Sequence, residues 1–259
     1  MKIQGAAVLI TGASAGIGAA LAAELGRRGA RLAVTGRDAG RLEAVRAEFA
    51  LAGDLCEEAF RTRLFAEAEE ALGGVDILVN NAGVGLYAPP AASNLGLVRA
   101  MFELNFFAAV DLAQRAAVAM RERGRGAIVN ISSIAGRVTL PWFTLYSASK
   151  FALTAFTEGL RAELAGTGVE AMVVSPGYVR TGFQGNVLDG DPPEALKRAR
   201  RFATTPEACA RAIADGIEQS RKEIVTPFSG QALVWAARLW PGLIAWQLER
   251  MNRDLGSAP

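Results

Sequence analysis

The chain contains no histidine and only two cysteines, Cys56 and Cys209, among its 259 residues. The absence of histidine excludes Ser-His-Asp hydrolysis, histidine-based zinc sites and imidazole acid–base chemistry. Two cysteines supply neither a four-cysteine metal site nor a disulfide framework, so no metal site is predicted. Any chemistry must therefore use serine, tyrosine, lysine or carboxylate side chains, or a bound cofactor.

An excess of one charge is also missing, because 28 Lys and Arg against 26 Asp and Glu give a net charge of +2. The basic residues are scattered along the chain, so no nucleic-acid partner is predicted. The N-terminal apolar run, Ala6–Ile10, is too short for the core of a signal peptide. No run reaches the roughly 18 apolar residues that a membrane-spanning helix needs. We therefore expect a soluble cytoplasmic protein.

Short apolar runs alternate with longer amphipathic segments along almost the whole chain. Strands that are apolar on both faces and separated by helices predict an α/β protein with a parallel sheet covered on each side. The expected strands are Ala6–Ile10, Leu32–Thr35, Phe49–Ala52, Val75–Val79, Ala127–Ile131, Val169–Ser175 and Ile224–Thr226. The expected helices are Ala15–Arg28, Ala39–Phe49, Glu57–Leu72, Leu95–Arg123 (in two pieces), Ser147–Ala165 and Pro206–Ser220. With no linker in sight, residues 1–259 are expected to form a single domain.

Two segments depart from this alternation. Residues 177–205 have no clear periodicity, which predicts either a functional loop or a mobile surface insertion. The tail, about residues 230–252, predicts a helical extension with an apolar stripe interrupted by Pro241. The stripe consists of Trp235, Leu239, Trp240, Leu243 and Trp246. It predicts packing on the core or a subunit contact, or else docking on a membrane surface, where tryptophan is favoured.

A glycine-rich turn, Thr11–Gly18, follows the first expected strand and opens the first expected helix. Gly12 permits a tight exit from the strand, and Gly16 lets a phosphate approach the backbone. Gly18 lets the helix pack closely on the sheet, with its first N–H groups facing the anion. The turn therefore predicts a dinucleotide site.

The end of the second expected strand bears on which dinucleotide binds. Sites that prefer NAD usually carry an acidic residue there, whereas this chain has Gly36 followed by Arg37. A guanidinium can bind a 2′-phosphate bidentately, so NADP(H) is predicted over NAD(H). The neighbouring Asp38 argues the other way, and Arg37 could also be an ordinary solvated loop charge.

Tyr146 and Lys150 lie four residues apart at the start of an expected helix and so share one face. An adjacent ammonium stabilises a phenolate, which a phenol of ordinary pKa near 10 needs for acid–base work at neutral pH. Ser132 and Ser133 follow the strand Ala127–Ile131, at the edge of a parallel sheet where ligands bind. The Tyr/Lys pair alone indicates acid–base chemistry, whereas serines at this position are more often ordinary strand-end residues.

Two further polar positions stand out. The segment Asn80–Gly83 follows the strand Val75–Val79. Its composition is typical of a turn, and a binding site is the second interpretation. Asn105 lies among apolar neighbours in an expected helix, where an amide is costly unless it is hydrogen-bonded.

Taken together, these residues resemble the short-chain dehydrogenases/reductases, in their single-domain branch. The resemblance runs from Ala6 to about Thr226 and implies a doubly wound Rossmann fold with a seven-stranded parallel sheet flanked by helices. It rests on six motifs in the order of the family, namely Thr11–Gly18, Asp54-Leu55, Asn80–Gly83, Asn105, Ser133 with Tyr146 and Lys150, and Pro176-Gly177.

The resemblance implies a catalytic set of Asn105, Ser133, Tyr146 and Lys150. Tyr146 would donate a proton to a carbonyl or accept one from an alcohol, and Ser133 would hydrogen-bond that oxygen. Lys150 would bind the nicotinamide ribose and lower the pKa of Tyr146, while Asn105 would hold a water that links Lys150 to solvent. The implied cofactor-binding residues are Gly12, Ser14, Ala15, Gly16, Ile17, Gly18, Arg37, Asp54, Leu55, Asn81, Ala82, Gly83, Tyr146, Lys150, Pro176, Gly177, Val179 and Thr181.

The implied activity is the NADP(H)-dependent interconversion of a small carbonyl compound and its alcohol, in a homodimer or homotetramer. Residues 177–205 fall where the family carries its substrate loop. An apolar wall favours a hydrophobic ketone or a long-chain carbonyl over a sugar; its expected members are Leu86, Tyr87, Ile134, Val138, Leu140, Trp142, Phe143, Tyr178, Phe183, Val187 and Leu188. The alternatives are a protein that binds NADP(H) without turnover, and an epimerase or dehydratase, which share the Tyr/Lys pair.

Overall fold

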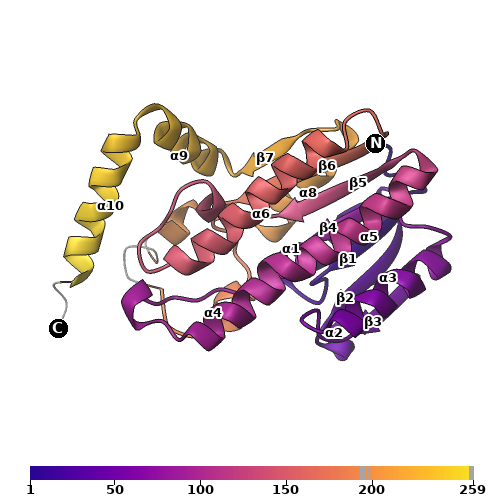
Figure 1. Ribbon diagram of the computed structural model, residues 1–259, viewed down its shortest axis with the longest axis horizontal. Helices are drawn as coiled ribbons and strands as arrows, with labels where there is room; N and C mark the ends of the chain where they lie inside the picture. The colour runs from indigo at the N-terminus through magenta and orange to yellow at the C-terminus, as the bar shows by residue number, and fades with distance from the viewer. Residues whose placement is uncertain (193–196, 198, 257–259) are drawn as a thin grey trace.

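The computed structural model describes residues 1–192, 197 and 199–256. Seven parallel strands form one sheet in the order β3-β2-β1-β4-β5-β6-β7 (Figure 1). The strands are β1 (Ala7–Thr11), β2 (Arg31–Gly36), β3 (Phe49–Ala52), β4 (Ile77–Asn80), β5 (Gly126–Ile131), β6 (Val169–Pro176) and β7 (Glu223–Thr226). The seven-stranded parallel sheet expected from the apolar runs is confirmed.

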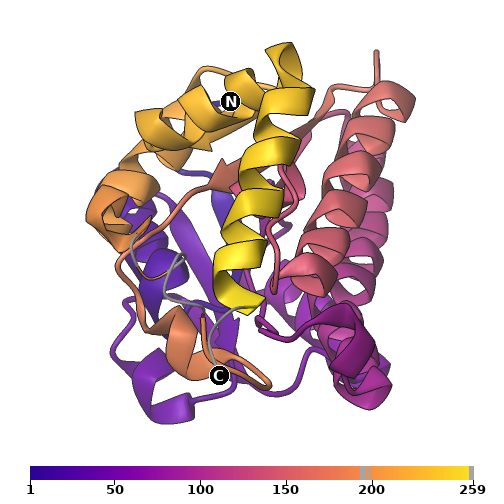
Figure 2. The same ribbon diagram turned by 90° about the vertical axis from the view of Figure 1, so that its left-hand side faces the viewer.

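Helices cover both faces of the sheet, as Figure 2 shows with α8 on one side and α5 and α6 on the other. Side chains alternate along β1, so that Val8 and Ile10 belong to one apolar core and Ala7 and Leu9 to the other. The first core packs against α1 and α8, and the second against α3, α5 and α6. The helices are α1 (Gly16–Arg27), α2 (Ala39–Glu43), α3 (Glu58–Leu72), α4 (Leu95–Phe102), α5 (Ala108–Arg123), α6 (Thr144–Glu163), α8 (Pro206–Glu218), α9 (Phe228–Leu239) and α10 (Pro241–Gly256).

Two helix boundaries differ from the sequence-based expectation. The helix expected over Ala39–Phe49 ends at Glu43, because the backbone N–H of Glu48 already donates to Leu32 O and starts the pairing of β3 with β2. The helix expected to begin at Ser147 begins at Thr144 instead, so Tyr146 and Lys150 both lie in its first two turns. The expected Leu95–Arg123 helix comprises α4 and α5, joined by a π-helical segment, Glu103–Phe107.

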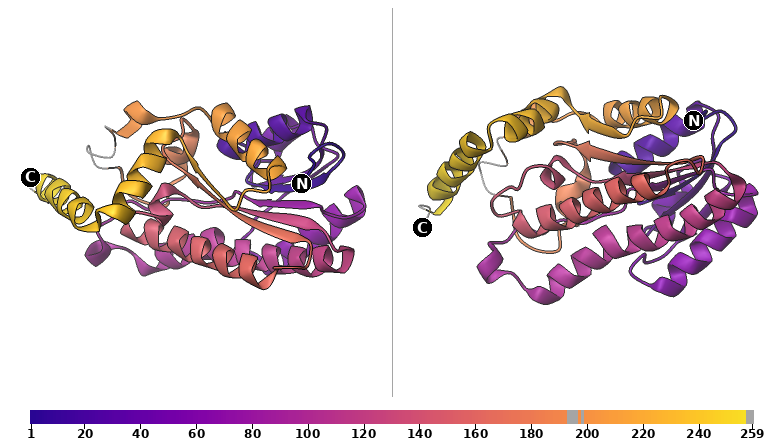
Figure 3. Two further views of the ribbon diagram at one scale, coloured as in Figure 1. Left: turned by 90° about the horizontal axis from the view of Figure 1, so that it is seen from above. Right: turned by 45° about the horizontal axis from the view of Figure 1, so that its top comes forward.

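The expected tail helix is present as α9 and α10. Pro241 begins α10, which carries the chain away from the sheet, as Figure 1 and Figure 3 show. The stripe does not pack on the core, since Trp235, Trp240 and Trp246 keep 55%, 59% and 48% of their surface exposed. Among the described residues, no helix combines the length and the hydropathy needed to cross a bilayer.

Candidate active site

A cavity of about 920 Å³ opens at the carboxyl edge of the sheet, where the strand order reverses between β1 and β4. Open parallel sheets bind their ligands at such a point. Two predicted residues, Gly18 and Asn105, do not line this cavity. The predicted residues that do line it are Gly12, Ser14, Ala15, Gly16, Ile17, Arg37, Asp54, Leu55, Asn81, Ala82, Gly83, Ser133, Tyr146, Lys150, Pro176, Gly177, Val179 and Thr181.

The glycines of the turn pack closely against neighbouring segments, which leaves little room for a Cβ at these positions. Gly12 has a φ of +66°, and a Cβ there would lie 2.9 Å from Ala82 Cα. A Cβ on Gly18 would lie 2.3 Å from Gly12 O, so Gly18 holds α1 against the turn instead of facing the cavity. A Cβ on Gly16 would lie 3.2 Å from Thr181 Cγ2, which brings the loop after β6 against the start of α1. Gly16, the first residue of α1, therefore presents its backbone to the cavity without a side chain, an arrangement that suits an anion.

The segment after β4 is fixed to β1 by hydrogen bonds. The N–H groups of Asn81 and Ala82 donate to Thr11 Oγ1 over 3.0 and 3.1 Å. Asn81 Nδ2 donates to Thr11 O over 2.9 Å and to Gly12 O over 3.1 Å. Asn81 thus shapes the glycine turn through its amide, while Ala82 and Gly83 form the cavity wall. Sequence reasoning did not identify the part played by Thr11.

Asn80, the first residue of the predicted motif, lies outside the cavity and links the strands to the helices behind them. Its Nδ2 donates to Asn130 Oδ1 over 2.9 Å and to Ala109 O over 3.0 Å. Asn130 Nδ2 in turn donates to Thr157 Oγ1 on α6 over 2.9 Å. This buried network holds α5 and α6 in place behind the site.

Charged side chains gather at the end of the cavity beyond β2. Asp38 caps α2 by accepting from the Arg41 N–H over 3.0 Å, and its carboxylate pairs with Arg41 Nε over 3.1 Å. The carboxylate of Asp38, which argued against a 2′-phosphate, is therefore ion-paired with the guanidinium of Arg41. Arg37, Asp38 and Arg41 all line the cavity. Sequence reasoning weighed Asp38 but missed Arg41, which follows it by one helical turn.

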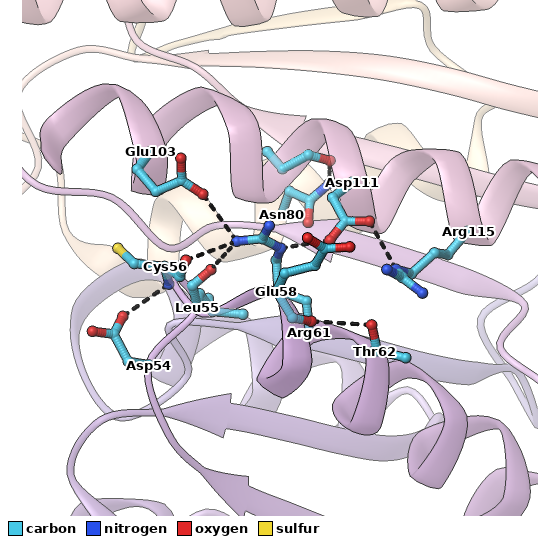
Figure 4. A network of polar contacts seen from close by, with 11 residues as sticks. Asp54, Leu55, Cys56, Glu58, Arg61, Thr62, Asn80, Glu103, Asp111 and Arg115 are labelled. Atoms are coloured by element: carbon cyan, nitrogen blue, oxygen red, sulfur yellow. Dashed lines mark hydrogen bonds and ion pairs between the residues drawn. The ribbon is translucent and has the colours of Figure 1, made fainter. Parts of the chain in front are cut away.

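The loop after β3 is held in place by Arg61, which sequence reasoning did not identify (Figure 4). The Arg61 guanidinium is buried and donates to Leu55 O over 2.7 Å. It also pairs with Glu103 on the π-helical segment over 3.0 Å and with Asp111 on α5 over 2.5 Å. Asp54 Oδ1 accepts from the Cys56 N–H over 2.9 Å. Arg61 thereby ties the cavity wall at Asp54 and Leu55 to α5.

Tyr146 and Ser133 come together in the cavity from α6 and from the end of β5. Their hydroxyls are hydrogen-bonded to each other, and Tyr146 is only 6% exposed. Burial raises the pKa of the Tyr146 phenol above its ordinary value, and the Ser133 hydroxyl partly opposes this rise. The direction is opposite to the lowered pKa expected from Lys150. Tyr146 therefore holds its proton at neutral pH.

Lys150 follows Tyr146 by one turn of α6, as expected from the spacing. Its Nζ lies 5.8 Å from the centre of the Tyr146 ring and donates to Ile131 O over 3.0 Å. Burial lowers the pKa of Lys150 to about 8, because the ammonium is removed from water. The amine therefore titrates close to the neutral range.

Lys150→Met is expected to change how the free energy of unfolding depends on pH. Folding lowers the pKa of Lys150 from 10.5 to about 8, so the unfolded chain holds more protons than the folded protein between these values. The unfolding free energy of the wild type should therefore rise with pH in this window relative to the variant, by on the order of 3 kcal/mol. Urea unfolding at a series of pH values measures this difference. Lys222→Met, which removes an exposed ammonium, is the control, and parallel curves for wild type and Lys150→Met would contradict the expectation.

Asn105 stands behind the cavity in the π-helical segment and is only 1% exposed. Its Oδ1 accepts from the Val84 N–H, and its Nδ2 donates to Val84 O, each over 2.9 Å. Nδ2 also donates to Ser149 Oγ over 3.1 Å. The side chain therefore fixes the segment after β4 to α6, and the expected role of Asn105 in holding a water stays a prediction.

Ser132 and Ser133 divide into a structural residue and a site residue. Ser132 Oγ donates to Lys150 O over 2.9 Å and bonds to Thr154 Oγ1 over 2.9 Å. A Cβ on Gly136 would lie 2.5 Å from the same Oγ, so the turn after β5 packs tightly on α6. Ser132 thereby attaches β5 to the helix of Tyr146, and Ser133 directs its hydroxyl to the phenol.

The rest of the cavity is apolar and is formed by the loops after β4, β5 and β6. The segment at Gly85 and Tyr87 is bonded to the middle of the expected substrate loop, with Leu188 N donating to Gly85 O and Tyr87 N to Asp189 O. Residues 193–196 and 198 of that loop lie outside the described part of the chain. The expected wall residues that line the cavity are Tyr87, Ile134, Leu140, Phe143, Tyr178, Phe183 and Leu188. Leu86, Val138, Trp142 and Val187 are not among the residues that line it; Leu86 and Val138 are buried.

A doubly wound sheet with a bare glycine turn at its switch point defines a nucleotide-binding α/β protein. The comparison with known proteins gives the family. The sequence model for the short chain dehydrogenase family matches residues 6–191. The chain belongs to the short-chain dehydrogenase/reductase family, an oxidoreductase family.

Relatives and solved structures agree with this assignment. Dehydrogenase/reductase SDR family member 7B of Danio rerio is 33% identical, over 93% of this chain and 84% of that protein. The ketoacyl reductase HetN of Nostoc sp. is also 33% identical, over 86% of this chain and 79% of that protein. A short chain dehydrogenase/reductase from Burkholderia phymatum, solved with NAD, superposes with a TM-score of 0.85 at 27% identity, over 94% of this chain and 96% of that one. A short chain dehydrogenase from Burkholderia cenocepacia, solved with NADP, gives 0.79 at 27% identity, over 96% and 99%.

Proposed function

We propose that the protein is an NADP(H)-dependent oxidoreductase that interconverts an apolar carbonyl compound and its alcohol, with Tyr146 as the general acid and base. One observation carries the proposal. The hydroxyls of Ser133 and Tyr146 are hydrogen-bonded to each other, with Lys150 one helical turn further on, in the same cavity as the glycine turn.

The residues around the cavity fit a nicotinamide dinucleotide. The exposed backbone of Gly16 at the start of α1 suits the diphosphate, and neighbouring structures were solved with NAD and with NADP. Arg37 and Arg41 line the end of the cavity that would hold the adenosine ribose, and the carboxylate of Asp38 is paired with Arg41. A guanidinium that recognises a 2′-phosphate bidentately would therefore find little competing negative charge, which favours NADP(H).

The chemistry follows from the groups around Tyr146. Bound NADPH would supply the hydride for the carbonyl carbon. As negative charge develops on the substrate oxygen, the Ser133 hydroxyl would donate a hydrogen bond and Tyr146 would transfer its proton. The phenolate left behind would be stabilised by the ammonium of Lys150, which is the ionised form below a pH of about 8. The oxidation of an alcohol would use the same groups in reverse.

The distribution of charge supports an uncharged substrate. Among the described residues, the charged side chains that line the cavity lie on the nucleotide half and at Lys150; they are Arg37, Asp38, Arg41, Asp54 and Lys150. The half beyond Tyr146 is walled by aromatic and aliphatic side chains such as Leu140 and Leu188. Such a wall desolvates a phosphate or carboxylate without compensation. A hydrophobic ketone or aldehyde is therefore favoured over a sugar phosphate or a keto acid.

Loss of the absorbance of reduced nicotinamide, followed with a panel of carbonyl compounds, tests this proposal. We expect turnover with hydrophobic ketones or aldehydes, higher kcat/KM with NADPH than with NADH, and little turnover with anionic analogues of the same size. Binding of NADPH without turnover on any member of the panel would instead support a protein that binds the dinucleotide without catalysis.

A further inference from the structure

Three aromatic rings form a column that ends at the proposed catalytic tyrosine. The Phe143 ring lies between Tyr87 and Tyr146, with ring centres 4.3 Å and 4.1 Å away and interplanar angles of 10° and 19°. Phe183 meets Tyr146 edge-on, with ring centres 5.8 Å apart. Tyr87, Phe143 and Tyr146 are each at least nine-tenths buried. Stacked rings at these distances attract one another beyond the burial of their surface.

The backbone before Phe143 adopts a costly conformation that places its ring in this column. Trp142 has a φ of +64°, a left-handed conformation that is rare for a bulky residue. Trp142 O accepts from the Ala88 N–H over 3.0 Å, which attaches the turn before α6 to the segment of Tyr87. Conformations of this kind persist only where the surroundings enforce them, and they gather at functional sites.

The column is independent of the hydrogen bonds that hold the other groups of the site. Lys150 is fixed by Ile131 O, and Ser133 by its acceptance of a hydrogen bond from the Ala135 N–H over 3.1 Å. The Tyr146 ring is instead held on one face by Phe143 and at its edge by Phe183. Phe143 lines the cavity itself, so it also forms the wall beside the phenol.

We propose that Phe143 is a positioning residue for Tyr146, which fixes the plane of the phenol through the stack and keeps water from the ring face that it covers. The inference rests on the proposed function for its role in turnover, but the stack also makes a prediction for the protein without substrate or cofactor. Removing the ring would let water reach the phenol, and the part of the pKa rise that is due to burial would be reduced.

Alkaline titration of Tyr146 tests this physical effect directly. The chain has three tyrosines, so Tyr87→Phe with Tyr178→Phe leaves Tyr146 as the only phenol while keeping the ring of residue 87 in the stack. In this background we expect no tyrosinate absorbance until the fold is lost at high pH, as followed by circular dichroism. Adding Phe143→Leu should make Tyr146 ionise at a lower pH, before unfolding.

Kinetics test the consequence for turnover. Phe143→Leu in the otherwise unaltered chain should lower kcat roughly 10- to 100-fold with little change in NADPH affinity, because the phenol is no longer held in line. The fall of kcat at high pH should also begin at a lower pH in this variant. Phe143→Tyr, which keeps an aromatic ring at this position, should retain the kcat and the pH dependence of the wild type. Phe156→Leu, the same exchange at a partly buried ring of α6 outside the cavity, is the matched control. Phe143→Met replaces the leucine variant if that variant does not fold.

The outcomes separate this inference from the proposed function. Unchanged ionisation of Tyr146 and unchanged kcat in Phe143→Leu would overturn the positioning role, even if the wild type reduces ketones with NADPH. A lower ionisation pH in a protein that turns over no carbonyl compound would overturn the proposed function and leave the stack's control of the phenol supported.

Discussion

Tyr146→Phe is expected to lower turnover by at least ~10²-fold, the usual size of a general acid–base contribution. The exchange removes the hydroxyl that is hydrogen-bonded to Ser133 and leaves the ring in its stack with Phe143. The proton donor is lost, while the glycine turn and the arginines beyond β2 are untouched. Single-turnover oxidation of bound NADPH by a hydrophobic ketone measures the effect.

Binding and folding must be followed in the same variant. Tyr146→Phe should bind NADPH with wild-type affinity, as measured by the fluorescence of the reduced nicotinamide, and should keep a wild-type melting temperature within a few degrees. Phe183→Leu, which alters a ring that meets Tyr146 only at its edge, provides a comparison with a smaller expected loss. Near-normal turnover in Tyr146→Phe would remove the catalytic assignment.

Arg37→Ala is expected to weaken NADPH binding roughly 10- to 100-fold, the range for a charge-assisted hydrogen bond to an ionised group. NADH has no 2′-phosphate, so its affinity should change little. Isothermal titration of both nucleotides against the wild type and the variant measures the two effects in one experiment. The expected result is a loss of selectivity and not a general loss of binding.

Arg41→Ala is the informative companion to this variant. Arg41 pairs with Asp38, so its removal would leave a carboxylate without its partner beside the proposed phosphate position. NADPH should be weakened here as well, and NADH should be spared. Equal weakening of NADPH and NADH in Arg37→Ala would mean that Arg37 does not contact the 2′-phosphate.

The elements of the fold were predictable because their signals are local. Strands such as Ile77–Asn80 are apolar on both faces, and Gly12 and Gly18 of the turn between β1 and α1 have no room for a Cβ. The end of α2 was not predictable from local charge patterning, because the pairing of Glu48 with Leu32 in the neighbouring strand decides it. The amide of Asn105, in the π-helical segment, likewise bonds to Val84 on a distant loop, a contact that local patterning does not reveal.

Some residues of the candidate site were likewise predictable from local sequence, and others were not. Spacing along one helix placed Tyr146 and Lys150 together, and position at a strand end indicated Ser133. Sequence alone could not tell that Phe143 stacks on Tyr146, since the stack depends on the left-handed turn at Trp142. Nor could it identify Arg61, whose partners Asp111 and Glu103 lie some forty to fifty residues further along the chain.

The direction of the pKa shift of Tyr146 was the one electrostatic expectation that the structure reversed. The neighbouring amine was expected to lower this pKa, whereas burial raises it and Lys150 donates to Ile131 O. A spacing argument counts the ammonium but not the water that the fold removes from around the phenol.

A crystal structure of the protein with NADP⁺ and a hydrophobic secondary alcohol tests the account most directly. We predict that the alcohol oxygen lies within hydrogen-bond distance of both the Ser133 and the Tyr146 hydroxyls, with the 2′-phosphate against Arg37. An alcohol oxygen bound away from these two side chains, or a nucleotide bound outside the cavity, would contradict the account.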